Sequence, residues 1–187
     1  MIKINITNTQ DLTRDHQGAN ASGIRSLRLV QAHLVKWINP FKDKLLSGDV
    51  VLADDIFPQT IEITADSCSW SEDMSETASG TIYRTNISFS IPKERPALRN
   101  WMHANKQTRW IAFTQDRNGQ YRLHGCLQSP LRIGTATSAG AGRSGRSQRS
   151  FGLAGDNLIP AQFMKAINND FFTERPFTHE FDSLTFN

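Results

Sequence analysis

The sequence feature that most restricts the possible folds is an alternation near the middle of the chain. Every second residue from Tyr83 to Ile91 is apolar or β-branched, and the residues between them are polar. A period of two places alternate side chains on opposite faces of a strand, and one polar face is typical of antiparallel sheets. The pattern predicts a strand over residues 81–91. We expect it to pair with residues 60–70, which precede an acidic turn at residues 71–76.

The clearest short-range signal is Asn118-Gly119, a pair that favours tight hairpin turns. It predicts a hairpin between strands 109–114 and 121–127. Pro96 predicts the start of a helix over residues 96–105, because proline fits the first helical position. Leu98, Trp101 and Met102 share one face of that helix, which we expect to lie in the core. Other segments are then assigned as follows: strands over 131–137 and 149–155, a brief helix over 163–167, and a strand or a helix over 24–38, the strand being favoured.

These elements predict a mainly β fold of two packed antiparallel sheets, sandwich- or barrel-like, with one short helix and a long Gly/Ser/Arg loop. A chain of 187 residues is large enough for one domain with a real core. We divide it into a polar arm with the first strand or strands (1–59), a β domain (60–165) and an aromatic, acidic extension (166–187). Cys68 and Cys126 have no partner spacing, so we expect small core residues in a reducing cytoplasm. No stretch approaches transmembrane length.

Charge is sorted along the chain. Counting Lys and Arg against Asp and Glu, residues 50–91 carry a net charge of −6 and residues 92–149 carry +9. If these blocks lie on different faces of one fold, copies of the chain attract each other head to tail, and such contacts build rings or stacks. Ordinary solvated faces are the equally weighted alternative.

A low-complexity stretch at residues 138–148 carries arginines at every third position, Arg143 and Arg146, followed by Arg149. Such a loop can bind phosphates, dock on carboxylates of a neighbouring subunit, or be a plain surface hairpin. It lacks the aromatic residues that stack bases, so we favour docking over nucleic-acid binding. The carboxylates expected to accept it are those of the acidic block: Glu72, Asp73, Glu76, Asp54 and Asp55.

No arrangement of residues indicates catalysis. Residues 140–145 match the Gly-x-Gly-x-x-Gly expression for dinucleotide binding, but a strand follows where a helix is needed. The histidines show no metal-ligand spacing, and His124 with Cys126 is more typical of packing. There is no nucleophile elbow, triad spacing or phosphate-binding loop. We therefore expect no enzyme activity, no cofactor and no metal.

Several segments between Ile61 and Phe163 resemble tube-forming tail proteins of long-tailed bacteriophages, particularly those of Bacteroidetes phages and prophages. The resemblance covers just over half the chain, and its motifs are structural ones. The segments that carry it are Ala65-Asp66-Ser67-Cys68-Ser69-Trp70, Gly80-Thr81-Ile82-Tyr83, Ile91-Pro92-Lys93-Glu94-Arg95, Trp110-Ile111-Ala112-Phe113, Asp116-Arg117-Asn118-Gly119, Tyr121-Arg122-Leu123-His124-Gly125, Ser150-Phe151-Gly152-Leu153-Ala154-Gly155-Asp156 and Pro160-Ala161-Gln162-Phe163.

The resemblance implies packed antiparallel sheets flanked by a helix, in subunits that close into rings, usually hexameric. Inner strands would join into a continuous barrel, and stacked rings would conduct DNA without reading its sequence. The protein would then be a virion component assembled in the host cytoplasm, in contact with other tail or neck proteins. Residues 1–60 lie outside the matched region, which makes a neck or tail-terminating ring protein credible. Two alternatives stay open: a nucleic-acid-binding module using residues 92–149, and a small enzyme.

Overall fold

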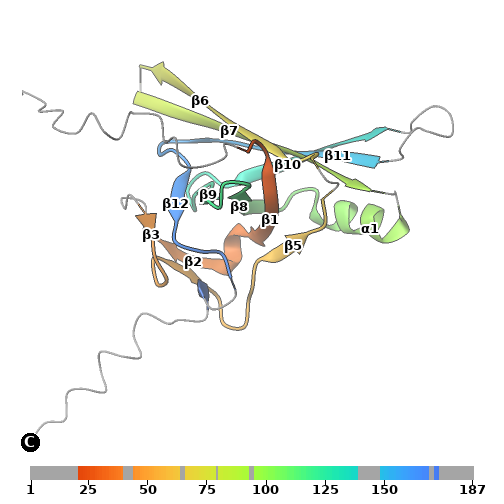
Figure 1. Cartoon of the computed structure of the whole chain (residues 1–187), viewed down its shortest axis with the longest axis horizontal. Helices are drawn as coiled ribbons and strands as arrows, with labels where there is room; N and C mark the ends of the chain where they lie inside the picture. The colour runs from red at the N-terminus through yellow and green to blue at the C-terminus, as the bar shows by residue number, and fades with distance from the viewer. Residues whose placement is uncertain are drawn as a thin grey trace, which may run out of the picture.

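Strands make up most of the described residues of the computed structural model (Figure 1). The structure describes residues 21–39, 44–63, 66–78, 80–92, 95–138, 148–168 and 171–172. Within these ranges the chain is mainly β with one α-helix, as the sequence predicted. The strands are β1 (Ile24–Gln31), β2 (Val35–Ile38), β3 (Lys44–Leu45), β4 (Val50–Leu52), β5 (Gln59–Ile61), β6 (Ser69–Thr77), β7 (Gly80–Pro92), β8 (Arg109–Asp116), β9 (Tyr121–His124), β10 (Leu131–Ser138), β11 (Gln148–Asn157) and β12 (Gln162–Met164); the helix is α1 (Pro96–Asn105).

Ten of these strands form one bent sheet that is not closed into a barrel. The bend lies at β8, which pairs with β9 through Ala112–Gln115 and with β10 through Arg109 and Trp110. The sheet thereby divides into a four-stranded layer, β6-β7-β11-β10, and a central layer, β5-β1-β8-β9-β12-β3. Strands β2 and β4 form a separate small sheet. All pairs are antiparallel except β12 with β3, which departs from the predicted all-antiparallel arrangement.

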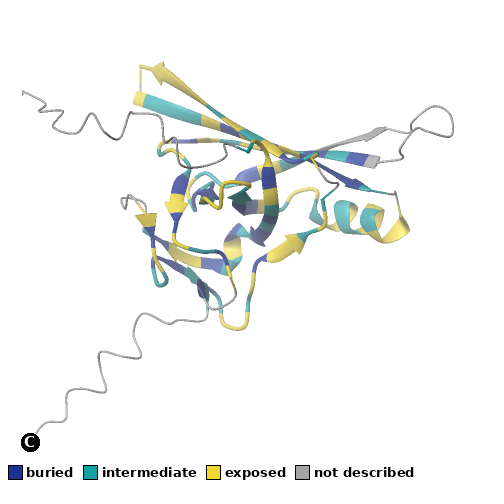
Figure 2. Cartoon of the chain, in the orientation of Figure 1, coloured by how far each residue is buried: buried dark blue, intermediate teal, exposed yellow. Residues whose placement is uncertain are grey.

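Two hydrophobic cores lie on opposite faces of the central layer, and β8 contributes to both. Trp110 and Ala112 face the four-stranded layer, whereas Ile111 and Phe113 face the small sheet. All four side chains are buried, and the dark-blue core of Figure 2 runs through β8 and β1. An all-round apolar stretch of this kind is typical of a strand that is covered on both faces.

The helix begins and ends where the sequence predicted, at Pro96 and Asn105. Its predicted inner face of Leu98, Trp101 and Met102 does pack on the core beneath the four-stranded layer. None of its residues is buried, however, so the expectation that Trp101 lies within the core was wrong. Trp101 is half-buried and stacks on Trp110, with ring centroids 5.6 Å apart. The helix covers one end of the core and leaves its own outer side in water.

The predicted acidic turn at residues 71–76 is instead the body of strand β6, which pairs with β7 from Ser69 to Thr77. One reason is that Glu72 is satisfied on the inner side: its Oε2 accepts a 2.7 Å hydrogen bond from the Ala161 backbone N–H. The other carboxylates stand on an outermost strand, where water solvates them and charged residues are common.

Three further assignments need correction. Residues 60–70 do not form one strand: Gln59–Ile61 is β5, which pairs with β1 rather than β7. Residues 163–167 are not helical, because buried Gln162 and Met164 alternate with exposed Phe163 in strand β12. The strand favoured over 24–38 is confirmed as β1 and β2, but a 3-10 turn at Ala32–Leu34 interrupts it. The Asn118-Gly119 hairpin is confirmed between β8 and β9.

The corner where β10 leaves β8 depends on a glycine. A Cβ atom on Gly155 would lie 2.9 Å from Leu131 Cδ2 and 3.4 Å from its Cα atom. Leu131 is fully buried and has no room to withdraw. We therefore expect Gly155→Ala to lower the free energy of unfolding by about 1–3 kcal/mol, as overpacking does, measured by urea denaturation. Gly152→Ala on the same strand is the matched control, since its nearest neighbour would be Asn86 Oδ1 at 4.0 Å; an equal loss in both variants would contradict the steric explanation.

Candidate functional site

The four-stranded layer has two open edges among the described residues. On one side β6 pairs only with β7. On the other, β10 pairs with β8 only at Leu131 and Arg132, so the edge from Ile133 to Ser138 has no partner strand in the described part of the chain. An edge strand presents unpaired N–H and C=O groups, ready to bond to another strand.

The outer face of this layer is uncovered, and most of its side chains are short. Ser69, Ser88, Gly152 and Gly134 stand opposite one another in a row across all four strands. The Ser69 and Ser88 hydroxyls share a 2.9 Å hydrogen bond along this row. Exposed residues of the face are Ser69, Ser71, Asp73, Ser75, Arg84, Asn86, Ser88, Arg132, Gly134, Ala154 and Asp156. Two arginines and two aspartates leave this exposed set without net charge.

Charge separates along the strand direction of the same layer. Glu76 lies near the hairpin end of β6 and β7, which is at the left of Figure 1, and Asp73 lies at the middle of β6 opposite Arg84. The opposite end adjoins α1, where Arg95, Arg99 and Lys106 lie without a carboxylate between residues 95 and 115. Strand β7 has 13 residues, so the two ends are about 40 Å apart. Glu76 of the acidic block and Arg95, Arg99 and Lys106 of the basic block thus lie toward opposite ends of this layer.

The three predicted acceptors on β6 differ in their surroundings. Glu72 faces inward and accepts hydrogen bonds from the Ala161 N–H and, at 3.4 Å, from Thr85 Oγ1. Asp73 faces outward opposite Arg84, which is itself paired with Asp156 at 3.0 Å. Both carboxylates raise the pKa of the Arg84 guanidinium, Asp156 by the larger amount. Glu76 is exposed near the hairpin end. Asp73 and Glu76 are therefore the acceptors open to another molecule.

Asp54 and Asp55 do not join this group. They lie in the turn that follows β4, in the small sheet on the other side of the central layer. Asp54 is 3.6 Å from Lys36 Nζ, and Asp55 has a left-handed backbone, with φ of 60°. The acidic block of the sequence is thus divided between two sides of the molecule.

The arginine loop is only partly described. Arg143 and Arg146 lie outside the described residues, between the ends of β10 and β11. Arg149 is within β11 and is 7% exposed. Its side chain lies beneath α1, with Nη1 2.6 Å from Met102 Sδ. Arg149 thus stands under the helix, away from the outer surface where a docking residue is expected.

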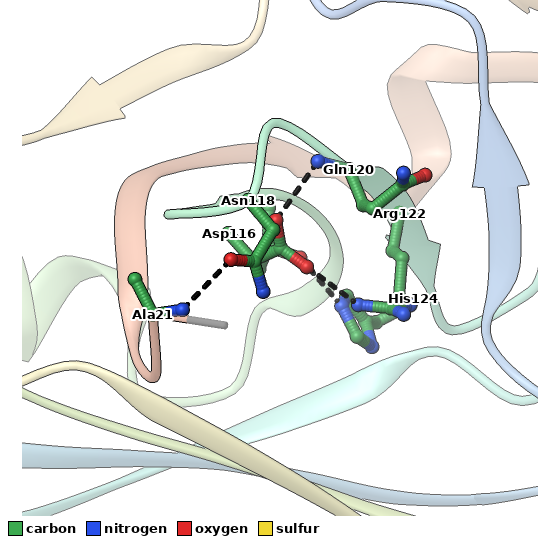
Figure 3. Close-up of polar contacts among 7 residues, drawn as sticks. Ala21, Asp116, Asn118, Gln120, Arg122 and His124 are labelled. Atoms are coloured by element: carbon green, nitrogen blue, oxygen red, sulfur yellow. Dashed lines mark hydrogen bonds and ion pairs between the residues drawn. The ribbon is translucent and has the colours of Figure 1, made fainter. Parts of the chain in front are cut away.

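A partly buried polar cluster in the β8–β9 hairpin was not anticipated from the sequence (Figure 3). Asp116 accepts hydrogen bonds from the Gln120 backbone N–H and from Arg122 Nη1, at 2.8 and 3.2 Å. The Arg122 guanidinium lies between two rings, 4.8 Å from Trp70 and 4.6 Å from Phe163. This arginine therefore joins β9 to β6 and β12, strands that are far apart in the sequence.

His124 lies beside this cluster and is wholly buried. Its Nε2 atom shares a 2.8 Å hydrogen bond with Thr114 Oγ1. Burial, with a smaller contribution from the Arg122 charge, lowers the pKa of His124 to about 3, so the ring is neutral near neutral pH. Cys68 and Cys126 are buried free thiols, and burial raises the pKa of Cys68 to about 12, which keeps it protonated and unreactive.

In the part of the chain that the structure describes, no three His, Cys, Asp or Glu side chains gather in a way that could hold a metal ion. Over the same residues, no helix has the length and apolar character to cross a membrane. Comparison with known proteins adds nothing further: no family model, no curated protein and no solved structure matches this chain.

The buried His124 predicts a particular acid sensitivity. The folded state keeps the ring neutral down to a pKa of about 3, whereas the unfolded chain takes up a proton below about 6.5. Between these values the unfolded state binds more protons, so stability falls as the pH falls. In urea denaturation at pH 7.5 and 4.5, His124→Gln should reduce the loss of unfolding free energy on acidification by about 3 kcal/mol. Exposed His33 gives the control His33→Gln, which should behave as the parent; an unchanged acid dependence in His124→Gln would refute the assignment.

Proposed function

We propose that this protein is a virion structural subunit that assembles head to tail into rings, which stack into or cap a bacteriophage tail tube. The observation that carries the proposal is the pair of open edges, β6 and Ile133–Ser138 of β10, on opposite sides of one sheet. A single sheet with two different free edges can bind a copy of itself on each side. Such a contact is heterologous and closes into a ring when the rotation between copies allows it.

Strand direction is compatible with this pairing. Each neighbouring pair in the order β6-β7-β11-β10 is antiparallel, so β6 and β10 also run antiparallel to each other. A rotated copy would therefore present its β6 antiparallel to β10, and the alternation would continue from subunit to subunit. Closure of the sheet would remove both edges.

The uncovered face supports a conduit. In a closed ring this face would point inward, because the central layer and the small sheet cover the other side. Six copies would give a barrel of about 24 strands, more than the 16–18 that already enclose an aqueous channel. Small residues of the face such as Ser69, Ser88 and Gly134 would leave that channel wide. The exposed residues of the face carry no net charge, so they would not hold DNA by its phosphates.

The separated charges support stacking of the rings. The acidic hairpin end of one subunit would meet the basic α1 end of the next, and Arg143 and Arg146, which follow β10 in the sequence, would add to this attraction. Individual exposed ion pairs contribute under about 1 kcal/mol, but they repeat around a ring. The same surfaces suit contacts with other tail or neck proteins, assembled in the host cytoplasm.

A charge-reversal pair tests the proposal. Asp73→Lys with Glu76→Lys places positive charge on β6 and should abolish the stacking of rings into tubes, because it sets like charges against the basic α1 end of the next ring. Asp54→Lys with Asp55→Lys makes the same change in net charge on the small-sheet side and should assemble as the parent does. Sedimentation velocity and negative-stain images at modest salt give the readout, with circular dichroism to establish folding. A parent protein that stays monomeric from low to high micromolar concentration, or two variants that assemble alike, would refute the proposal.

A further inference from the structure

An open apolar pocket lies where the four-stranded layer extends past the β5 edge of the central layer. Its floor is formed by Phe89, Ile91 and Phe151, and its sides by Ile61 of β5 and Trp101 of α1. The three floor side chains are buried in the body of the sheet. Glu62 and Arg95 form an exposed ion pair of 3.2 Å at the rim. The pocket is thus an uncovered part of the core, bounded by one helix and one edge strand.

The size of the pocket suits a single ring. Its volume is about 140 Å³, close to that of an apolar cavity that takes up benzene. The walls are aromatic and aliphatic, and Phe89 stacks on Phe151 with centroids 5.1 Å apart. A phenyl side chain would meet ring faces and edges on several sides, which are favourable aromatic contacts.

Charge around the pocket favours an acidic partner. Beyond the Glu62–Arg95 pair, Arg99 and Lys106 add positive charge along the helix, and the sequence has no carboxylate between residues 95 and 115. Residues 173–187, which follow the described Phe171 and Phe172, carry Glu174, Glu180 and Asp182 against a single arginine. The same segment contains three phenylalanines, Phe177, Phe181 and Phe186, whereas residues 1–20 contain none. Residues 173–187 therefore supply both an aromatic ring that fits the pocket and negative charge that complements the helix beside it.

We propose that residues 173–187 dock on this pocket of their own chain, with the Phe181 ring inside it and Glu180 and Asp182 beside Arg95 and Arg99. Phe172 packs against Phe113 on the other face of the central layer. The path from Phe172 around the β5 edge to the pocket is roughly 30 Å long. This length is the sum of two layer spacings and the width of two strands. Phe181, nine residues further on, spans about 30 Å when extended, whereas Phe177 spans only about 17 Å. Docking of this kind does not depend on ring assembly.

Fluorine NMR of the full-length chain labelled with 5-fluorotryptophan tests the proposal, because Trp101 lines the pocket. Phe181→Ser should shift the Trp101 resonance, and Phe177→Ser, the matched control in the same segment, should not. Trp37 in the small sheet is 47% exposed and should keep its resonance in both variants. An unmoved Trp101 resonance in Phe181→Ser, or an equal shift in Phe177→Ser, would overturn the placement of Phe181.

A disulfide trap then identifies the chain that supplies the segment. Thr60 is exposed on β5 and lines the pocket, so Thr60→Cys with Ser183→Cys, which keeps the Phe181 ring, should oxidise within one chain. The rate should be at least about tenfold that of Ser75→Cys with Ser183→Cys, in which the first cysteine stands on the outer face, because docking raises the effective concentration. Cross-linking only between chains would replace the proposal with docking on a second copy. Equal rates in the two pairs would overturn it altogether.

Discussion

The fold depends on the burial of β8 on both of its faces. Trp110 and Ala112 belong to one core and Ile111 and Phe113 to the other, so a single strand joins all three layers of the molecule. The same strand changes partner from β9 to β10, and that change lets the sheet turn back over itself. Since neither core can form without β8, we expect the layers to fold and unfold together, with the β8 amides among the last to exchange.

Local signals in the sequence were enough for several elements. The alternation over residues 81–91, the Pro96 helix start and the Asn118-Gly119 turn each act within a few residues, and all three are present in the structure. Strand β6 was missed because its inward carboxylate, Glu72, is satisfied by Ala161, 89 residues away in the sequence. No pattern within β6 itself indicates that partner.

The candidate surface was predictable only in outline. Charge sorting in the sequence indicated two complementary regions, and the structure places Glu76 and Arg99 toward opposite ends of one sheet. The charge pattern could not show that Arg149 lies beneath α1, or that Asp54 lies beside the small sheet. Both positions depend on which strands become neighbours. The position of Arg122 between the Trp70 and Phe163 rings was unpredictable for the same reason. Long-range pairing, rather than composition, decides which charges reach a common surface.

The carboxylates of β6 also make one kind of pairing at this edge unfavourable. A two-fold antiparallel pair of β6 strands centred on Asp73 would set that carboxylate opposite its own copy, and a pair centred on Met74 would set Glu72 opposite Glu76 of the other copy. Like charges placed opposite each other destabilise a sheet. A two-fold symmetric dimer through this edge is therefore disfavoured, although the strand is long and free. Pairing of β6 with the uncharged Ile133–Ser138 edge meets no such repulsion. Any filament built by that pairing would have two unlike ends, and every subunit in it would point the same way.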